Sequence, residues 1–217
     1  MKKAIIVLFG APGCGKGYLG NCIKKEILNQ KIVSENEINY ISTGDLLRAE
    51  IASGSEFGQE IAQILNSGGL VDDEIVKRLL VKELEKEASI VFFDGYPRTK
   101  DQFDDFYDFY LMMPPCEFFA VKRDTPVELI LERVSKRRVC KDCKTTHSVD
   151  EGCCPQCGGE SIVRKDDAII QHRLDKYEKY TSSLWDELSI SSDDAVVVDG
   201  SQDAEEVAKE LVERFFG

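Results

Sequence analysis

The sequence contains no apolar run long enough to cross a bilayer, no internal repeat and no low-complexity segment. The absence of a long apolar run argues against a membrane-spanning helix, so no membrane partner is expected. Residues 4–9 already have the pattern of a buried strand, with no secretory signal before them. We therefore predict a cytoplasmic protein.

Positive charge is scarce, with 28 Lys and Arg against 40 Asp and Glu and a formal net charge of −12 at pH 7. A general nucleic-acid binder needs a basic surface, so no nucleic-acid partner is expected. Several of the cations are concentrated around a cysteine-rich stretch, namely Arg133, Lys136, Arg137, Arg138, Arg164 and Arg173. This concentration indicates one anionic ligand. For the first four, a solvated helix face is the alternative.

Apolar runs alternate with helical patterns along the 217 residues. Strands are predicted at 4–9, 90–93, 117–121 and 195–198. Helices are predicted at 16–30, 56–66, 72–87 and 168–188, with a final helix ending at 216, and another helix capped by Ser42 or Thr43. This alternation predicts an α/β fold with a parallel sheet flanked by helices.

A glycine-rich loop links the first strand to the first helix. Gly10-Ala11-Pro12-Gly13-Cys14-Gly15-Lys16 has the spacing of the phosphate-binding loop of nucleotide triphosphate-binding proteins. Bare backbone N–H groups, the helix N-terminus and the lysine ammonium would together hold phosphates. An ordinary glycine-rich turn is the alternative. Gly17 and Tyr18 stand where a hydroxyl residue usually meets Mg²⁺, so the metal must be held in another way.

Asp94 is the candidate for that task. It follows the predicted strand at 90–93, and the carboxyl ends of parallel strands face the ligand crevice. We predict that Asp94 holds Mg²⁺, directly or through water, with a surface-turn aspartate as the alternative. Further along, residues 125–128 are interpreted as a capping box with proline at the first helical position. Arg133 and Arg137, four apart, are expected on one face of that helix.

Two C-x-x-C pairs, Cys140/Cys143 and Cys154/Cys157, flank a short polar segment. Four thiolates in this pattern predict a closed structural zinc site, and Cys153 or His147 remain alternatives for one ligand. The segment has too little apolar content to order itself without metal. Cys140, Cys143, Cys154 and Cys157 should therefore stabilise a small rigid flap.

Several motifs in order give the chain a close resemblance to the adenylate kinase family, in its long form with a zinc-bearing lid. They are residues 10–17, Ser42-Thr43-Gly44-Asp45-Leu46-Leu47-Arg48, Asp94-Gly95-Tyr96-Pro97-Arg98-Thr99, Arg133 with Arg137-Arg138, the four cysteines, Arg164-Lys165-Asp166-Asp167 and Val198-Asp199-Gly200. The resemblance implies a P-loop core (1–42, 72–137 and 165–217), a helical monophosphate-binding segment (43–71) and a zinc lid (138–164). It implies a monomer that converts Mg·ATP and AMP reversibly into two ADP.

The resemblance also assigns contacts. For ATP they are Gly13, Cys14, Gly15, Lys16, Gly17, Tyr18, Arg133, Arg137, Thr146, His147 and Gln202. For AMP they are Thr43, Arg48, Gly69, Leu70, Val71, Gly95, Tyr96, Pro97, Arg98, Gln102, Arg164 and Arg173. The charge that stabilises the transferred phosphoryl group would come from Lys16, Arg98, Arg133, Arg137, Arg164 and Arg173.

The chain departs from the family pattern at three places. Tyr18 replaces a threonine, His147 stands where the lid commonly offers a tyrosine, and the spacing from Asp167 to Arg173 is two residues short. Two other functions stay open: a UMP/CMP-type kinase, against which Thr43, Gln102 and the long lid argue, and a nucleotide-binding zinc-ribbon module without turnover, against which the arginines argue.

Overall fold

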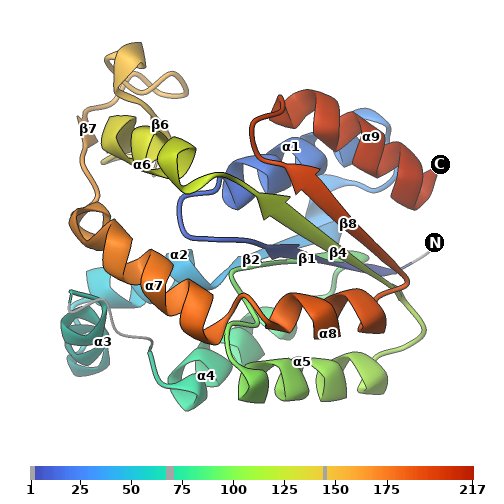
Figure 1. Ribbon diagram of the computed structural model, residues 1–217. Coiled ribbons are helices and arrows are strands. Elements are labelled where there is room, and N and C mark those ends of the chain that lie inside the picture. The colour runs from blue at the N-terminus through green and yellow to red at the C-terminus, as the bar shows by residue number, and fades with distance from the viewer. Residues whose placement is uncertain (1–2, 67–70, 144–145) are drawn as a thin grey trace.

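The computed structural model of the chain describes residues 3–66, 71–143 and 146–217. Its centre is a five-stranded sheet in which every neighbouring pair is parallel (Figure 1). In spatial order the strands are β2 (Ile38–Ser42), β3 (Ile90–Asp94), β1 (Ala4–Phe9), β4 (Glu117–Asp124) and β8 (Asp194–Asp199). The predicted α/β fold is confirmed.

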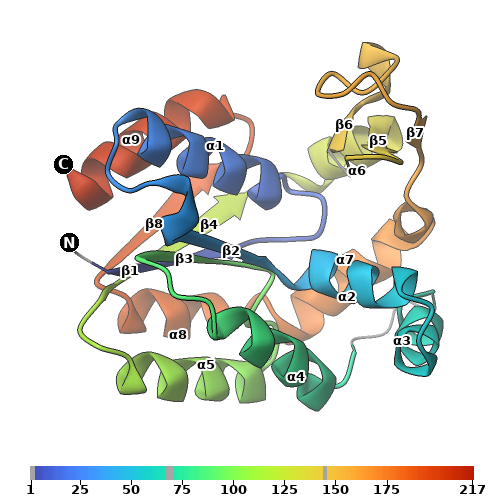
Figure 2. The ribbon, with the colours of Figure 1, turned by 180° about the vertical axis from the view of Figure 1, so that it is seen from behind.

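Helices cover both faces of the sheet (Figures 1 and 2). One face is covered by α1 (Lys16–Asn29) and α9 (Ala204–Phe216). The other carries α4 (Asp73–Leu84), α5 (Lys100–Met112) and α8 (Leu184–Ser191). The remaining helical elements are η1 (Glu35–Glu37), α2 (Thr43–Ala52), α3 (Glu56–Asn66), α6 (Val127–Lys136), η2 (Val149–Glu151), η3 (Lys165–Ile169) and α7 (Ile170–Tyr180).

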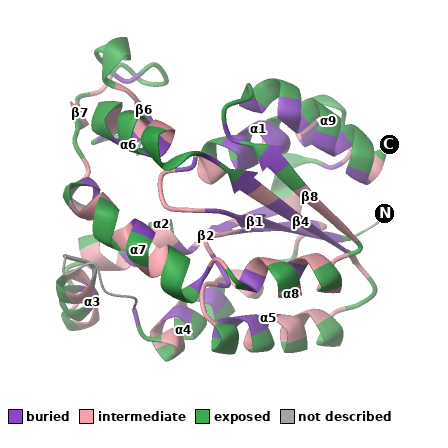
Figure 3. Ribbon diagram, in the orientation of Figure 1, coloured by how far each residue is buried: buried purple, intermediate pink, exposed green. Residues whose placement is uncertain are grey.

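The central strand β1 is buried along its whole length, and its side chains alternate between the two cores. Ile6 and Leu8 pack beneath α1 and α9, whereas Ile5 and Val7 pack against the opposite helices. Figure 3 shows buried residues along the strands and exposed residues on the outer sides of the helices. This two-sided burial explains why the strand is a continuous apolar run.

The parallel register brings functional positions to one edge of the sheet. Leu8 of β1 and Ser42 of β2 both pair with Asp94 of β3, so the phosphate loop, α2 and the Asp94 turn leave the sheet side by side. The predicted cap of α2 is confirmed, since the Ser42 hydroxyl accepts a hydrogen bond from the backbone N–H of Asp45 at 3.3 Å.

A second, antiparallel sheet lies beyond α6, where the chain projects away from the large sheet in Figure 1. Its strands are β6 (Thr146–Ser148), β5 (Arg137–Cys140) and β7 (Ser161–Ile162), in that order. The two C-x-x-C pairs lie in this sheet and in the loops that join its strands. Within the described ranges, no helix combines the length and apolar character that crossing a membrane would need.

Two local predictions are wrong. The region predicted as one helix at 168–188 is divided among η3, α7 and α8. Between α7 and α8, Thr181 is buried and its hydroxyl donates to the carbonyl of Arg98 at 2.8 Å. The capping box at 125–128 does not form. The Thr125 hydroxyl donates instead to the carbonyl of Cys14 at 3.2 Å, and α6 starts after Pro126.

Candidate active site

The glycine-rich loop has a backbone that side chains would obstruct. Gly10, Gly13 and Gly15 have φ angles of +141°, +85° and +90°, a region that favours glycine. A Cβ atom on Gly13 would lie 2.8 Å from methyl groups of Ile130 and Val134. The side chain of Lys16 folds back over the loop and donates to the carbonyl of Ala11 at 3.3 Å. The loop therefore combines bare backbone with one ammonium group, as phosphate binding requires.

Gly17 lets the end of β3 approach the start of α1. A Cβ atom at this position would lie 2.9 Å from Oδ2 of Asp94. Burial raises the pKa of Asp94, and the charges of Lys16 and Arg98 oppose this shift. The carboxyl group of Asp94 thus lies between the lysine of the loop and an arginine of its own turn.

Arg98 is held against the turn that follows β3. Its Nε donates to the carbonyl of Gly95 at 2.6 Å, and its Nη2 donates to the hydroxyl of Thr43 at 3.4 Å. Gly95 has a φ of +78°, and a Cβ there would lie 2.7 Å from Nη2 of Arg98. Burial lowers the pKa of Arg98, and the charge of Asp94 opposes that shift. The guanidinium is held by the carbonyl of Gly95 and the hydroxyl of Thr43.

Asp45 of α2 interacts with further arginines near Arg98. Its carboxylate lies 2.6 Å from Nη2 of Arg48. Burial raises the pKa of Asp45, but the charge and hydrogen bond of Arg48 outweigh burial, so that its pKa lies below the usual value, and Arg164 lowers it further. Arg164 follows the cysteine-rich sheet and directly precedes η3, which contacts α3.

The four predicted cysteine ligands are brought together. Their sulfur atoms all lie within 4.8 Å of one another, and the separations include 3.5 Å for Cys140–Cys157 and 3.4 Å for Cys143–Cys157. A tetrahedral zinc site with Zn–S bonds of about 2.3 Å has sulfur atoms about 3.8 Å apart. The residues Cys140, Cys143, Cys154 and Cys157 therefore fit a zinc ion.

The backbone beside the second C-x-x-C pair forms a tight turn. Gly158 has a φ of +71° and donates to the carbonyl of Cys154 at 2.8 Å. A Cβ on Gly159 would lie 3.0 Å from the sulfur of Cys140. These glycines let the chain turn tightly beside the sulfur atoms. Cys153 is exposed and is not among the clustered sulfurs.

Comparison with known proteins gives a consistent assignment. A family model described as adenylate kinase matches residues 8–192. The adenylate kinase of Mycoplasmopsis pulmonis is 37% identical, with 96% of each chain covered. That of Petrotoga mobilis is 34% identical, with 95% of this chain and 94% of the relative covered. The chain belongs to the adenylate kinase family. This membership confirms the predicted class, a phosphotransferase that converts ATP and AMP into two ADP.

Gln102 is already engaged within the protein. It is buried, its Oε1 accepts from the backbone N–H of Arg98 at 2.8 Å, and its Nε2 donates to Asp73 at 2.6 Å. The other carboxylate oxygen of Asp73 accepts from Thr99 at 2.7 Å. Asp73, which sequence reasoning missed, therefore links α4 to the turn that carries Arg98. The family contact between Gln102 and AMP stays a prediction.

Most of the other positions predicted to contact AMP are buried or half-buried where the structure describes them. Thr43 is buried, and its hydroxyl donates to the carbonyl of Gly95 at 2.8 Å. Tyr96, Pro97 and Val71 are also buried, while Arg173 lies half-buried on α7. Two predicted contacts, Gly69 and Leu70, lie outside the described residues.

His147 and Thr146, both predicted to contact ATP, differ in their burial. His147 is buried, with one ring nitrogen 2.6 Å from the hydroxyl of Ser161 and the other 2.8 Å from the carbonyl of Ser148. Its neighbour Thr146 is exposed on β6. The imidazole lies inside the small sheet, and the contacts of both residues with ATP stay predictions.

The helix after β4 ends one residue too early for the predicted arginine pair. Arg133 lies on α6, but Arg137 has an extended backbone and begins β5, so the two do not share a helix face. Arg137 instead forms a two-pronged ion pair with Asp167. This pair joins the two chain segments that enter and leave the lid.

Tyr18 points away from the phosphate loop. It is 61% exposed. Burial raises its pKa, and the groups that raise it further are Cys22 on α1 and Glu205 and Asp203 at the start of α9. The phenol therefore does not replace the family threonine hydroxyl beside Asp94.

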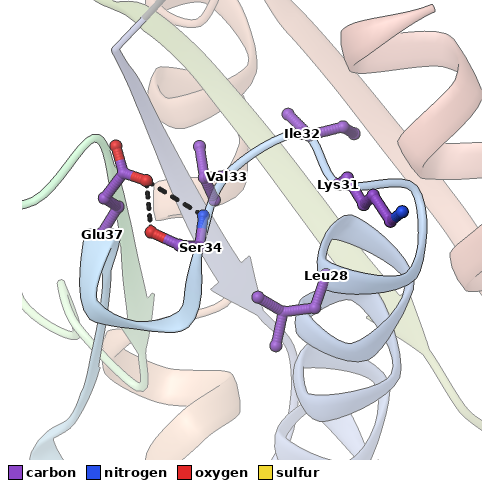
Figure 4. A pocket seen from close by; sticks show the side chains of 6 residues that line it. All are labelled: Leu28, Lys31, Ile32, Val33, Ser34 and Glu37. Atoms are coloured by element: carbon purple, nitrogen blue, oxygen red, sulfur yellow. Dashed lines mark hydrogen bonds between the residues drawn. The ribbon is translucent and has the colours of Figure 1, made fainter.

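A hollow of about 450 Å³ lies elsewhere, between the end of α1 and the start of β2 (Figure 4). Its lining residues are Leu28, Lys31, Ile32, Val33, Ser34 and Glu37. The backbone N–H and hydroxyl of Ser34 both donate to Glu37. Because β2 starts here and ends at the site, the hollow belongs to the opposite edge of the sheet and is not part of the active site.

Proposed function

We propose that phosphoryl transfer takes place at the carboxyl edge of the large sheet, between a loop that holds ATP and a group of arginines that holds AMP. The observation that carries this proposal is the parallel register that brings to one end of the sheet the segments of Lys16, Arg48 and Arg98, whose charges all lower the pKa of Asp94. These residues come from three separate segments, and the electrostatic coupling of Arg164 to Asp45 adds a fourth. Such a concentration of charge in an acidic protein supports binding of two phosphorylated ligands.

The residues carry the roles that the family resemblance assigns. The backbone of residues 13–18 and the ammonium of Lys16 hold the phosphates of ATP, with Arg133 and Arg137 above them and Thr146, His147 and Gln202 on the side of the base. Arg48, Arg98, Arg164 and Arg173 hold the phosphate of AMP. Thr43, Val71 and Gln102 border its base, and Gly69 and Leu70 complete that wall.

Positioned cations do most of the catalysis. The transferred phosphoryl group passes through a loose transition state with charge on its equatorial oxygens, so no strong base is required. Lys16, Arg98, Arg133, Arg137, Arg164 and Arg173 are the donors that stabilise this charge. Arg98 is fixed before substrate binds, because Gly95 and Thr43 hold its guanidinium.

The protein is expected to hold two metal ions with different tasks. Asp94 would hold Mg²⁺ through water, and Mg²⁺ bound with ATP would neutralise phosphate charge. Cys140, Cys143, Cys154 and Cys157 would hold a structural zinc ion, which leaves no open ligand position for chemistry. The zinc therefore orders the lid and takes no part in the transfer.

Three parts of the chain divide the work. Residues 1–42, 72–137 and 165–217 form the core, residues 43–71 bind the monophosphate, and residues 138–164 form the lid. Lid closure excludes water, the competing acceptor, a motion for which adenylate kinases are the standard example. The protein acts as a cytoplasmic monomer on ATP, AMP and ADP.

A panel of acceptors tests the proposed specificity. Purified protein is mixed with Mg·ATP and, in separate reactions, AMP, CMP and UMP, and ADP formation is measured. We expect rapid ADP formation with AMP only. Rapid formation with CMP would identify a pyrimidine monophosphate kinase instead, and ATP binding without turnover on any acceptor would identify a nucleotide sensor.

A further inference from the structure

Arg123 is a buried cation in an otherwise apolar strand. It is the last residue but one of β4 and is 4% exposed. Val121 and Phe119, two and four residues earlier, pack into the core beneath α1 and α9. The alternation of side chains along a strand places Arg123 on that same face. A guanidinium therefore occupies a position where the strand pattern calls for an apolar side chain.

The guanidinium lies directly behind the phosphate loop. A Cβ atom on Gly15 would lie 3.6 Å from Nε of Arg123, and one on Gly10 would lie 2.7 Å from its backbone carbonyl. Nη2 donates to the carbonyls of Gly200 and Gln202, both at 3.2 Å. Arg123 thus connects the phosphate loop to the loop after β8, where the family binds the base of ATP.

The remaining donors of Arg123 lack partners. Nε and Nη1 are buried, and neither has a hydrogen-bond partner in the described part of the chain. A buried donor without a partner is costly, and a buried charge without a counter-ion is more so. Such a group in a native structure requires an explanation.

The charges around Arg123 do not balance it. No ion pair with Arg123 occurs among the residues that the structure describes, and the nearby carboxylate of Asp203 already accepts the N–H groups of Glu205 and Glu206. Burial lowers the pKa of Arg123, and the positive charge of Arg133 lowers it further. The electrostatic surroundings of Arg123 thus include a second cation, Arg133, and the carboxylates of Asp203 and Asp199, neither of which forms an ion pair with it within the described ranges.

We propose that Arg123 is a further positioning residue for ATP, whose buried charge is balanced when the phosphates bind on the other side of the loop at Gly15. This inference rests on the proposed ATP site. The ligand-free protein carries the cost of an unbalanced guanidinium, and ATP binding relieves it. Stability without ligand and affinity for ATP should therefore respond in opposite directions when Arg123 is replaced.

The test compares three proteins: wild type, R123L and R123K. Calorimetric titration gives the dissociation constants for ATP and for AMP, and thermal melting is measured with and without ATP. For R123L we expect ATP to bind at least fivefold more weakly, AMP to bind as in wild type, and the melting temperature without ligand to stay equal or rise. For R123K, which keeps the charge, we expect ATP affinity within about twofold of wild type.

Arg214→Leu is the matched control, because Arg214 is an exposed arginine that pairs with Asp194 on the surface. It should leave both dissociation constants unchanged. The inference would be overturned if R123L melted at a lower temperature and bound ATP as wild type does, the result of a purely structural role. Equal weakening of ATP and AMP would overturn it as well. Failure of wild type to bind ATP would instead reject the proposed ATP site.

Discussion

The core and the lid hold their shapes by different means. In the core, all six residues of β1 are buried, and apolar side chains fill both faces of the sheet. In the lid, Ser161–Ile162 forms a strand of two residues with no buried side chain, while Cys140 and Cys154 are among the few buried positions. Apolar burial stabilises the core, and four thiolates and their metal are expected to stabilise the lid.

This difference matters for catalysis because the lysine and arginines proposed to stabilise the transferred phosphoryl group are divided between the two regions. Lys16 and Arg98 belong to the sheet edge, whereas Arg137 and Arg164 lie where the chain enters and leaves the lid. The ion pair of Arg137 with Asp167 ties together the two chain segments that lead into and out of the lid. Perturbing either region should therefore affect transfer, but only the core should determine global stability.

Metal removal should have the largest effect. Structural zinc contributes roughly 10–16 kcal/mol of apparent binding free energy in small zinc modules. We expect a strong chelator to disorder the lid and to slow ADP formation by about 100-fold, the loss typical of one missing preorganised donor. The thermal transition of the core should remain. Metal analysis, activity and circular dichroism measure the three quantities.

Cys153→Ser is the control for metal removal, because Cys153 is exposed and outside the sulfur cluster. It should keep one metal per chain and full activity. Unfolding of the whole chain in a single step upon chelation would contradict the proposed separation of core and lid.

Removing an aromatic side chain from the core should have the next largest effect. Phe118 is fully buried and packs against Phe106 and Tyr110, with ring centroids 5.2 and 5.4 Å away. Phe118→Ala should lower the free energy of unfolding by about 3–5 kcal/mol. Denaturant titration measures this loss, and metal content should not change. Val163→Ala in the lid, at a 57% exposed position, should change stability by no more than about 0.5 kcal/mol.

Lys16→Met removes charge from the phosphate loop and leaves the packing intact. We expect kcat to fall by about 10²–10³, or about 2.7–4 kcal/mol of transition-state stabilisation, with little change in melting temperature. Steady-state kinetics with Mg·ATP and AMP provide the measurement. Lys209→Met, on the exposed side of α9, should retain wild-type kcat. A comparable loss in both variants would show that the effect is not specific to the loop.

Tyr18→Thr should have the smallest effect. The tyrosine points away from Asp94, so restoring the family residue adds a hydroxyl without removing a contact in the site. We expect kcat to change by less than about tenfold, which corresponds to ~1.4 kcal/mol. Loss of all activity in this variant, or its first appearance, would contradict the placement of Tyr18.

The difference between the core and the lid also explains which strands could be predicted from the sequence. The β1 and β3 strands were predicted because two-sided burial produces continuous apolar runs, and the cysteine cluster because metal ligation fixes its spacing. β2 was missed because Ile38–Ser42 alternates between half-buried and buried positions at a sheet edge. The lid strands were missed because they are two to four residues long.

Within the site, local spacing located the phosphate loop and Asp94, and most other positions came from the family resemblance. The links of Asp73 to Gln102 and of Asp45 to Arg48 and Arg164 depend on tertiary structure or on surrounding charges. Arg123 could have been noticed in the sequence, because it is a cation on the apolar face of a strand. Its meaning depends on Gly15 and Gly200, which only the fold brings beside it.

The central claim is that one sheet edge holds two nucleotides with their phosphates facing each other. A crystal structure with two adenosines joined through five phosphates tests it most directly. The account predicts one adenosine end beside residues 13–18 and Gln202, the other beside Thr43 and Gln102, and the phosphate chain between Lys16 and Arg98. Density for only one adenosine, with Arg48 and Arg98 away from any phosphate, would contradict it.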